Sequence, residues 1–155
     1  MRDRFTEVVI AGKWHGSTKA RACGFDHAFR IRSNDGRFYN ADVETNLVFN
    51  SRELAVDWKA PSIQTAKHSL KGQYAPDILN RIVNSYIAHH KAAGSKFFVY
   101  YPMMLAHSPL EPPPLQAGVT GAKAIYKTQV EYVDQLVGRV GCLRLMVPLP
   151  ERNSC

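Results

Sequence analysis

The sequence contains no uninterrupted apolar run of about 18 residues, so no transmembrane helix is expected. Its first residues, MRDRFTEVVIAGKWHG, carry charges and lack the apolar core of a signal peptide. The three cysteines, Cys23, Cys142 and Cys155, are too few and too far apart for a disulfide framework or a cysteine-based metal site. These absences argue against a membrane-spanning or disulfide-stapled protein, and they leave the cellular compartment open.

A concentrated basic segment is also missing, although the net charge is +7. The positive residues are spread from Arg2 to Arg152, and their densest part lies between Lys13 and Arg32. A positive chain favours anionic partners, among them nucleic acid, acidic lipid and sulfated or phosphorylated substrates. Because no single basic helix or run stands out, nucleic acid is not expected as the partner, and neither is a membrane.

What the sequence does contain is one domain's worth of globular chain, with 155 residues of which 45% are hydrophobic. Runs of β-branched and aromatic residues predict strands at Phe5 to Ala11 and at Phe97 to Tyr101. The second run does not alternate between apolar and polar residues, which is typical of a strand buried on both faces of a parallel sheet. Short strands are also predicted at Phe29 to Arg32 and Leu47 to Phe49. The stretch from Arg52 to Gln73 has no clear period and is expected to be irregular surface.

Helical periodicity predicts two amphipathic helices. The first runs from Pro76 to about Lys91 and is followed by a strand, which is half of a parallel βαβ unit and indicates an α/β fold. The second runs from Ala122 to Val140, with Val130, Val133, Val137 and Val140 on one face. His89 and His90 fall in the last turn of the first helix, where we interpret them as surface residues that suit the helix dipole.

Ionisable side chains follow two of the predicted strands. Lys13 and His15 are two residues apart, so in an extended segment they point to the same side while Trp14 points to the other. His107 lies in a proline-rich loop after the second buried strand, and open α/β proteins build their sites in loops at the carboxyl ends of strands. A cation beside an imidazole can form a clamp for sulfate or phosphate. The alternatives stay open: a solvated Lys13 with Trp14 as a packing anchor, and His107 as an ordinary polar loop residue.

Four collinear stretches resemble the sulfatase family of the alkaline-phosphatase-like superfamily. AGKWHG is similar to the family's A-G-K-W-H-L-G with one residue fewer, and GFDH follows it at a family-like distance. KFFVYYPMMLAHSPLEPPP resembles the family's strand and histidine loop, while YAPDILNRIVNSYI and YKTQVEYVDQLVGRV resemble two of its helices. Residues 1–141 are therefore interpreted as the middle segment of a sulfatase catalytic domain, and residues 142–155 as a divergent tail. The implied fold is a partial alkaline-phosphatase-like α/β fold, with mostly parallel strands flanked by helices.

The resemblance implies roles for three residues. Lys13 matches the lysine that binds the sulfate group, and His15 matches the histidine that contacts the hydroxyl of the formylglycine nucleophile. His107 matches the histidine near the scissile ester oxygen, as a sulfate ligand or a proton donor. These residue types suit sulfate-ester hydrolysis, in which negative charge develops on the leaving group and on the sulfate oxygens.

Other parts of the family's machinery have no counterpart in these residues. No cysteine stands in the C-x-P-S-R or C-x-A-S-R context that yields formylglycine, and neither the Asp-Asp nor the Asp-Asn pair of the calcium site occurs. The second sulfate-binding lysine is missing too. Calcium and formylglycine are thus expected in the parent family but cannot be supported by this chain alone. We expect a segment of a longer or interrupted sulfatase with little or no turnover of its own.

The parent protein is expected to hydrolyse a sulfate monoester of a small molecule or polysaccharide. Two other hypotheses stay open: a phosphodiesterase or phosphonate monoester hydrolase of the same superfamily, and a non-catalytic basic module that binds anions. The second would require the cationic residues to converge on one face. The sequence does not indicate which sulfate ester is used, the localisation, or the oligomeric state.

Overall fold

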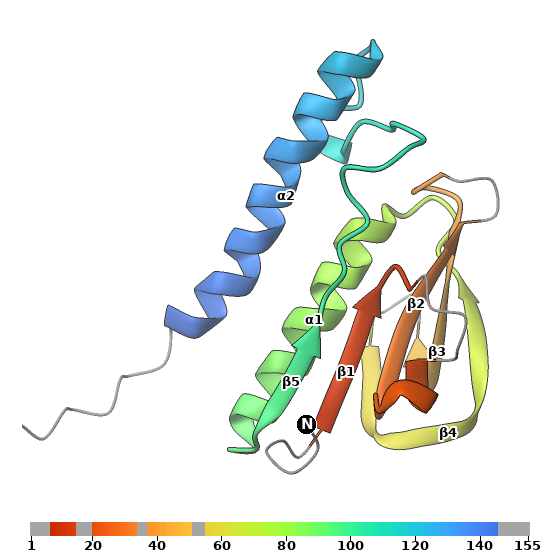
Figure 1. The fold of residues 1–155 in the computed structure, drawn as a ribbon, viewed down its shortest axis with the longest axis vertical. Helices are drawn as coiled ribbons and strands as arrows, with labels where there is room; N and C mark the ends of the chain where they lie inside the picture. Colours follow the sequence, from red (N-terminus) through yellow and green to blue (C-terminus); the bar gives the residue numbers. More distant parts are fainter. Residues whose placement is uncertain (1–6, 15–19, 34–36, 51–54, 146–155) are drawn as a thin grey trace, which may run out of the picture.

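The computed structural model describes residues 7–14, 20–33, 37–50 and 55–145, which form one sheet and two long helices (Figure 1). The elements in chain order are β1 (Glu7–Gly12), the 3-10 turn η2 (Ala20–Cys23), β2 (His27–Ser33), β3 (Ala41–Asn50), β4 (Ala55–Ser69), α1 (Ala75–Ala92), β5 (Phe97–Tyr100), the 3-10 turn η3 (Pro114–Gln116) and α2 (Ala122–Leu145). α1 packs on the sheet and α2 packs on α1. No helix in the described ranges is long and apolar enough to cross a membrane.

The described strands form a five-stranded mixed sheet in the order β4-β3-β2-β1-β5. β1 pairs in parallel with both β2 and β5, while β3 runs antiparallel to both β2 and β4. Four of the five strands therefore point the same way, and β3 alone is reversed. The prediction of an α/β fold with a mostly parallel sheet is confirmed.

The interior strand β1, which lies between β2 and β5, is buried on both faces, as its sequence EVVIAG predicts. Val9 and Ala11 belong to the core under α1, and the alternation of a strand turns Val8 and Ile10 to the opposite face. β5 differs from the prediction, because it forms the edge of the sheet. Its residues are only half-buried, and Tyr100 is 45% exposed. The expected burial of this strand on both faces is therefore wrong for this chain.

The stretch from Arg52 to Gln73 was expected to be irregular, and that prediction is wrong. It contains β4, a strand of 15 residues that pairs along β3. The register between the two strands shifts near Leu47, so neither keeps one alternation along its whole length. A strand with such an irregularity loses the period-2 signal that sequence reading depends on. The two short strands predicted within residues 29–49 are parts of the longer β2 and β3.

α1 agrees with its predicted range, whereas the buried face of α2 does not agree with the valine pattern. Val130 and Val137 are 47% and 53% exposed, whereas Val133 and Val140 are partly buried and Val140 packs against the core. The face of α2 that packs inward instead carries Gln129, Tyr132 and Leu136. α2 also runs through the predicted domain boundary at residue 141, and the division itself stays a prediction.

Polar contacts fix α2 against the first turns of α1. Burial raises the pKa of Tyr132 to about 12, so its hydroxyl stays protonated and donates to Asp77 Oδ1 at 2.7 Å. Arg139 Nη1 donates to the same oxygen at 3.2 Å, and Asn80 Nδ2 donates to the Leu136 carbonyl at 2.9 Å. These bonds explain why the tyrosine face of α2, rather than its valine face, is turned inward.

Candidate anion site

The residues after β1 and β5 are tied together at the carboxyl ends of these parallel strands. Gly12 ends β1 with a φ of 141°, a backbone conformation that residues with a Cβ rarely adopt. A Cβ on Gly12 would lie 2.1 Å from the Pro102 carbonyl oxygen, so only glycine allows this approach. The next backbone N–H, that of Lys13, donates to the same Pro102 oxygen at 3.1 Å.

This arrangement brings Lys13 and His107 into contact, although they lie 94 residues apart in the chain. Lys13 Nζ is 2.8 Å from His107 Nε2. The other ring nitrogen, His107 Nδ1, is within hydrogen-bond distance of the Ser108 carbonyl oxygen. A carbonyl oxygen only accepts hydrogen bonds, so Nδ1 carries the proton and Nε2 accepts from the lysine ammonium. The site therefore holds a cationic lysine beside a neutral imidazole.

The pair can be reached from solvent. His107 is exposed and Lys13 is half-buried. An ammonium carries three N–H donors, of which the bond to His107 uses one. The pair therefore matches the requirement of a clamp for a small oxyanion, which needs positive charge and directed N–H groups at an accessible position.

The loop that carries His107 is held by contacts that sequence reasoning missed. The Glu111 carboxylate accepts a short hydrogen bond from the Phe38 backbone N–H. The Glu111 carbonyl accepts from Nε2 of Gln129, a fully buried residue of α2, at 2.9 Å. Tyr39 donates its hydroxyl to the Pro112 carbonyl at 3.3 Å. The available sequence signal for these contacts was Gln129 itself, a glutamine within an amphipathic helix. An amide that becomes buried in a helix interface needs a hydrogen-bond partner.

The other candidate residues have different outcomes. His15 lies outside the described residues, so its position beside Lys13 stays a prediction. Trp14 is half-buried and makes an edge-to-face contact with Phe25, whose ring stacks on Tyr100. Trp14 is thus a packing anchor, which agrees with one of the two alternatives drawn from the sequence. That alternative also left Lys13 solvated, whereas the Lys13 ammonium contacts His107.

The two side chains that meet here do not form a calcium site. Calcium takes about six to eight oxygen ligands, whereas Lys13 and His107 offer nitrogens. Within the described ranges, no group of three or more His, Cys, Asp or Glu side chains is placed to hold a metal ion. The side chains placed by the structure therefore do not fit the metal that the sulfatase resemblance implies.

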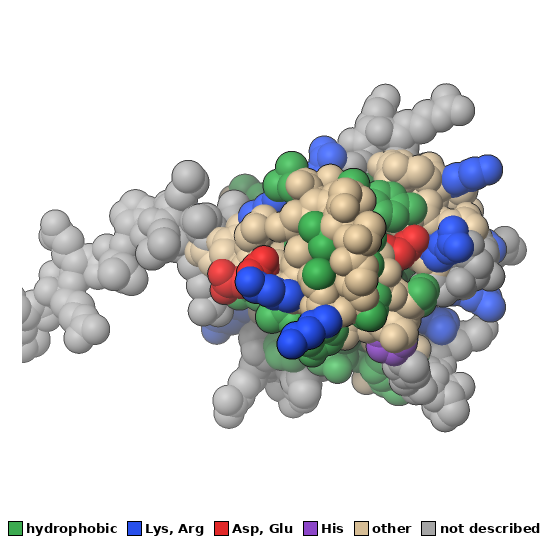
Figure 2. Space-filling model, turned by 90° about the horizontal axis from the view of Figure 1, so that it is seen from above, with side chains coloured by type: hydrophobic (Ala, Val, Ile, Leu, Met, Phe, Trp, Pro, Cys, Tyr) green, Lys and Arg blue, Asp and Glu red, His purple; other side chains and the backbone are tan. Residues whose placement is uncertain are grey.

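Arg30 and Lys67 both lie opposite Glu44 and so share one face of the sheet, but the basic side chains there are paired with carboxylates. Lys67 Nζ lies 2.7 Å from Asp42 Oδ2, and Arg32 Nη1 lies 3.1 Å from Glu44 Oε1. Arg30 is 3.9 Å from the other oxygen of Glu44. Figure 2, which views the end of the molecule toward which β1 and β5 point, shows Lys and Arg side chains scattered rather than gathered in one patch. On this end of the molecule, the described basic side chains therefore do not form one broad basic surface.

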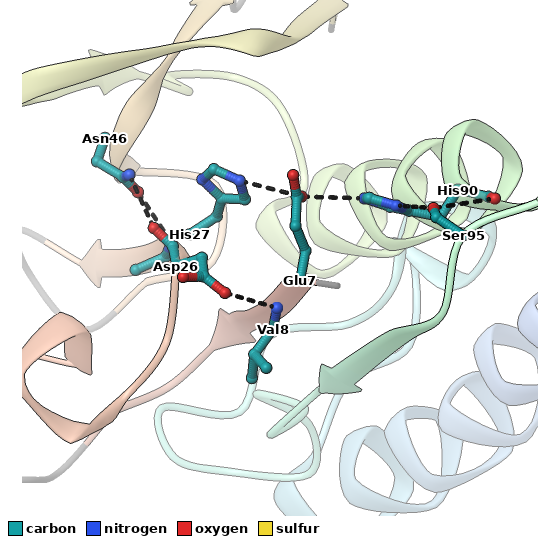
Figure 3. A network of polar contacts seen from close by, with 8 residues as sticks. Glu7, Val8, Asp26, His27, Asn46, His90 and Ser95 are labelled. Carbon is teal, nitrogen blue, oxygen red and sulfur yellow. Dashed lines mark hydrogen bonds and ion pairs between the residues drawn. The ribbon is translucent and has the colours of Figure 1, made fainter. Parts of the chain in front are cut away.

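A second polar cluster joins β1, β2 and α1 at the far end of β1 (Figure 3). Glu7 Oε2 lies 3.2 Å from His27 Nε2 and 3.1 Å from His90 Nε2. His90 Nδ1 lies 2.7 Å from the Ser95 hydroxyl, and His90 is only 3% exposed. The interpretation of His90 as a surface residue is therefore wrong, and His89 beside it is half-buried. Burial lowers the pKa of His90, and the nearby Glu7 carboxylate offsets this only in part.

Two residues of the GFDH stretch, Asp26 and His27, belong to this structural cluster, whereas Phe25 packs against Trp14. Asp26 Oδ2 accepts from the Val8 backbone N–H at 3.0 Å, and Asn46 Nδ2 donates to the Asp26 carbonyl at 3.1 Å. Asn46 Oδ1 in turn accepts from the Ala28 N–H at 2.9 Å (Figure 3). These bonds hold the start of β2 between β1 and β3.

Comparison with solved structures finds sulfatase neighbours. Ps i-CgsB matches with a TM-score of 0.58 and 17% sequence identity, over 92% of this chain and 34% of that one; its complex with k-i-k-neocarrahexaose gives the same values. BT33336S-sulf, from work on glycosaminoglycan metabolism by Bacteroides thetaiotaomicron, matches with a TM-score of 0.52 and 20% identity, over 91% and 40%.

Comparisons with family models and with curated proteins give no match. At these identities the structural likeness shows the fold alone. The chain spans about a third of the length of Ps i-CgsB. It has a sulfatase-like α/β fold.

Proposed function

We propose that this chain is a segment of a sulfatase-type hydrolase and that Lys13 and His107 form part of its site for the sulfate group of a sulfated saccharide. The observation that carries the proposal is the 2.8 Å contact between Lys13 Nζ and His107 Nε2 at the carboxyl ends of two parallel strands. The sulfatase-like fold supports the same assignment, and one neighbour binds a neocarrahexaose.

The chemistry of the two side chains suits a sulfate monoester. Lys13 supplies a positive charge and N–H donors to the nonbridging oxygens, and a charge-assisted bond of this kind contributes about 1.5–3 kcal/mol. His107 stands where its Nε2 can meet an oxygen of the same group. His15 is proposed as a third contact, on the strength of the sequence resemblance. The nucleophile and the metal of the sulfatase family have no residues in this chain, so the proposal assigns them to the longer parent protein and predicts little or no turnover by this chain alone.

The alternative of a basic anion-binding module is less favoured, because the sheet cations described above are paired with carboxylates. No observation on this chain favours a phosphodiesterase or phosphonate hydrolase over a sulfatase.

The test is binding of a sulfated neocarrahexaose, measured by titration calorimetry against its desulfated counterpart. We expect the wild-type chain to bind the sulfated form only. Lys13→Met should weaken binding about tenfold or more, because one charge-assisted bond is lost. Lys123→Met is the matched control, since Lys123 is an exposed lysine of α2, and it should leave the affinity within about twofold of wild type. Equal binding of the two sugars, or equal effects of the two substitutions, would contradict the proposal.

A further inference from the structure

We infer that binding of a sulfate group at the Lys13–His107 pair is coupled to the uptake of one proton by His107. The inference rests on the proposed function and concerns how the same site is regulated by pH. It follows from which nitrogen of His107 carries the proton when no anion is bound.

In the structure described here, both nitrogens of His107 have hydrogen-bond partners that fix its protonation state. Nδ1 must donate, because the Ser108 carbonyl can only accept. Nε2 lies 2.8 Å from Lys13 Nζ. Because an ammonium can only donate, Nε2 must accept this hydrogen bond. An imidazolium in this geometry would direct one N–H at another. The imidazole is therefore neutral while it is bonded to Lys13.

A bound sulfate changes what Nε2 has to do. Sulfate oxygens only accept hydrogen bonds, so they take N–H donors from Lys13 and present their own lone pairs to Nε2. The lone pair on neutral Nε2 then faces another lone pair. A proton taken from solvent onto Nε2 turns this repulsion into a charge-assisted hydrogen bond. One N–H bond forms on Nε2, the Nδ1–H donation to Ser108 is kept, and no bond of the sulfate ester breaks.

The surrounding charges are consistent with this coupling. The group facing His107 from the end of β1 is the Lys13 ammonium, and within its own loop it is the Ser108 carbonyl. In the described part of the chain, no carboxylate forms an ion pair with Lys13 or His107. While no anion is bound, a proton on Nε2 would face the N–H groups of Lys13, and two donors cannot bond to each other. The anion is therefore what admits the proton.

The test is calorimetric titration of the chain with sodium methyl sulfate at pH 7 in Tris and in Bis-Tris, whose ionisation enthalpies differ. Proton uptake makes the observed enthalpy depend on the buffer, and we expect a slope that corresponds to a net uptake of up to one proton. The affinity should rise as the pH falls, by at most about tenfold per pH unit. His107→Gln, which keeps hydrogen-bonding groups but does not titrate, should bind with no buffer dependence. His89→Gln, on α1, should keep the wild-type slope.

The outcomes separate the two claims. If the wild-type chain does not bind methyl sulfate, the proposed function fails and the inference fails with it. If the wild type binds with the same enthalpy in both buffers, the inference is overturned while the proposed function stands. A wild-type slope that persists in His107→Gln overturns it as well. Nitrogen chemical shifts of the His107 ring in the wild-type chain give an independent readout that needs no variant: the neutral Nδ1–H form should convert to imidazolium when methyl sulfate is added.

Discussion

At the scale of single residues, the candidate site depends on one glycine and one hydrogen bond. Gly12 allows the end of β1 to pack closely against the Pro102 carbonyl, and this close approach places Lys13 next to His107. The sequence suggested both partners, because each follows a strand and parallel strands end at the same edge of a sheet. It could not show that they touch, since the contact depends on a backbone approach between segments about 90 residues apart in the chain.

Replacing Gly12 with alanine tests that close approach. The new Cβ would meet the Pro102 carbonyl at 2.1 Å, and φ would be strained as well, so the ends of β1 and β5 must move apart. We expect a loss of stability of more than about 2 kcal/mol in urea unfolding and weaker binding of methyl sulfate.

Gly72→Ala is the matched control for Gly12→Ala. Gly72 also has a positive φ, 81°, but nothing lies within 4 Å of its Cβ position. Gly72→Ala should therefore lower the unfolding free energy only by the strain of the backbone conformation, about 1 kcal/mol. Equal costs at the two glycines would show that the approach to Pro102 is not what matters.

At the scale of elements, the sequence predicted α2 correctly as a helix but misjudged which side of it is buried. Valines at helical spacing suggested an apolar face, yet tertiary hydrogen bonds to Asp77 and Asn80 turn Tyr132 and Leu136 inward. Periodicity reports which residues share a face, and the partners of the polar residues decide which face packs.

Neighbouring alanine substitutions in α2 distinguish the two faces. Leu136 is fully buried, so Leu136→Ala should cost about 2–5 kcal/mol of unfolding free energy. Val137 is half exposed, so Val137→Ala should change stability by less than about 1 kcal/mol. Urea denaturation of both variants is the measurement. A larger loss of stability for Val137→Ala than for Leu136→Ala would show that the valine face is the buried one, as the sequence predicted.

The link from α2 to the His107 loop is tested at Gln129. Gln129→Ala removes the donor to the Glu111 carbonyl, and we expect a loss of about 1–3 kcal/mol together with weaker anion binding, because the loop carrying His107 loses an anchor. Gln135→Ala, at an exposed position of the same helix, should affect neither property. If Gln129→Ala destabilised the fold but left anion binding unchanged, the loop would be held in place without this bond.

At the scale of the whole molecule, hydrophobic patterning was enough to predict the α/β class, the buried strand β1 and both helices. It was not enough for β4, whose register with β3 shifts, or for the edge position of β5, which depends on which strands are present beside it. The cluster of Glu7, His27 and His90 was also missed. Its members come from three elements, and nothing in the local sequence around any one of them indicates the other two.

That cluster predicts how the stability of the fold responds to acid. Burial lowers the pKa of His90 below its usual 6.5, so the unfolded chain binds more protons than the folded chain as the pH falls through this range. The contribution of His90 to stability is therefore present above pH 6.5 and is lost as the pH falls toward the lowered value.

The measurement is urea unfolding of the wild type and of His90→Gln between pH 7.5 and pH 5. We expect the wild type to lose stability more steeply than the variant, whatever the constant offset between them. Parallel curves for the wild type and His90→Gln would contradict the assignment to His90.

The central claim, that Lys13 and His107 bind the sulfate group, is tested most directly by a crystal structure of the chain soaked in selenate, whose anomalous signal locates the anion. We predict a selenate oxygen at about 2.7–3.0 Å from Lys13 Nζ and another facing His107 Nε2, with the direct contact between the two side chains opened. If Lys13 remained bonded to His107 and the anion bound elsewhere or not at all, the assignment of this pair as the sulfate site would be wrong.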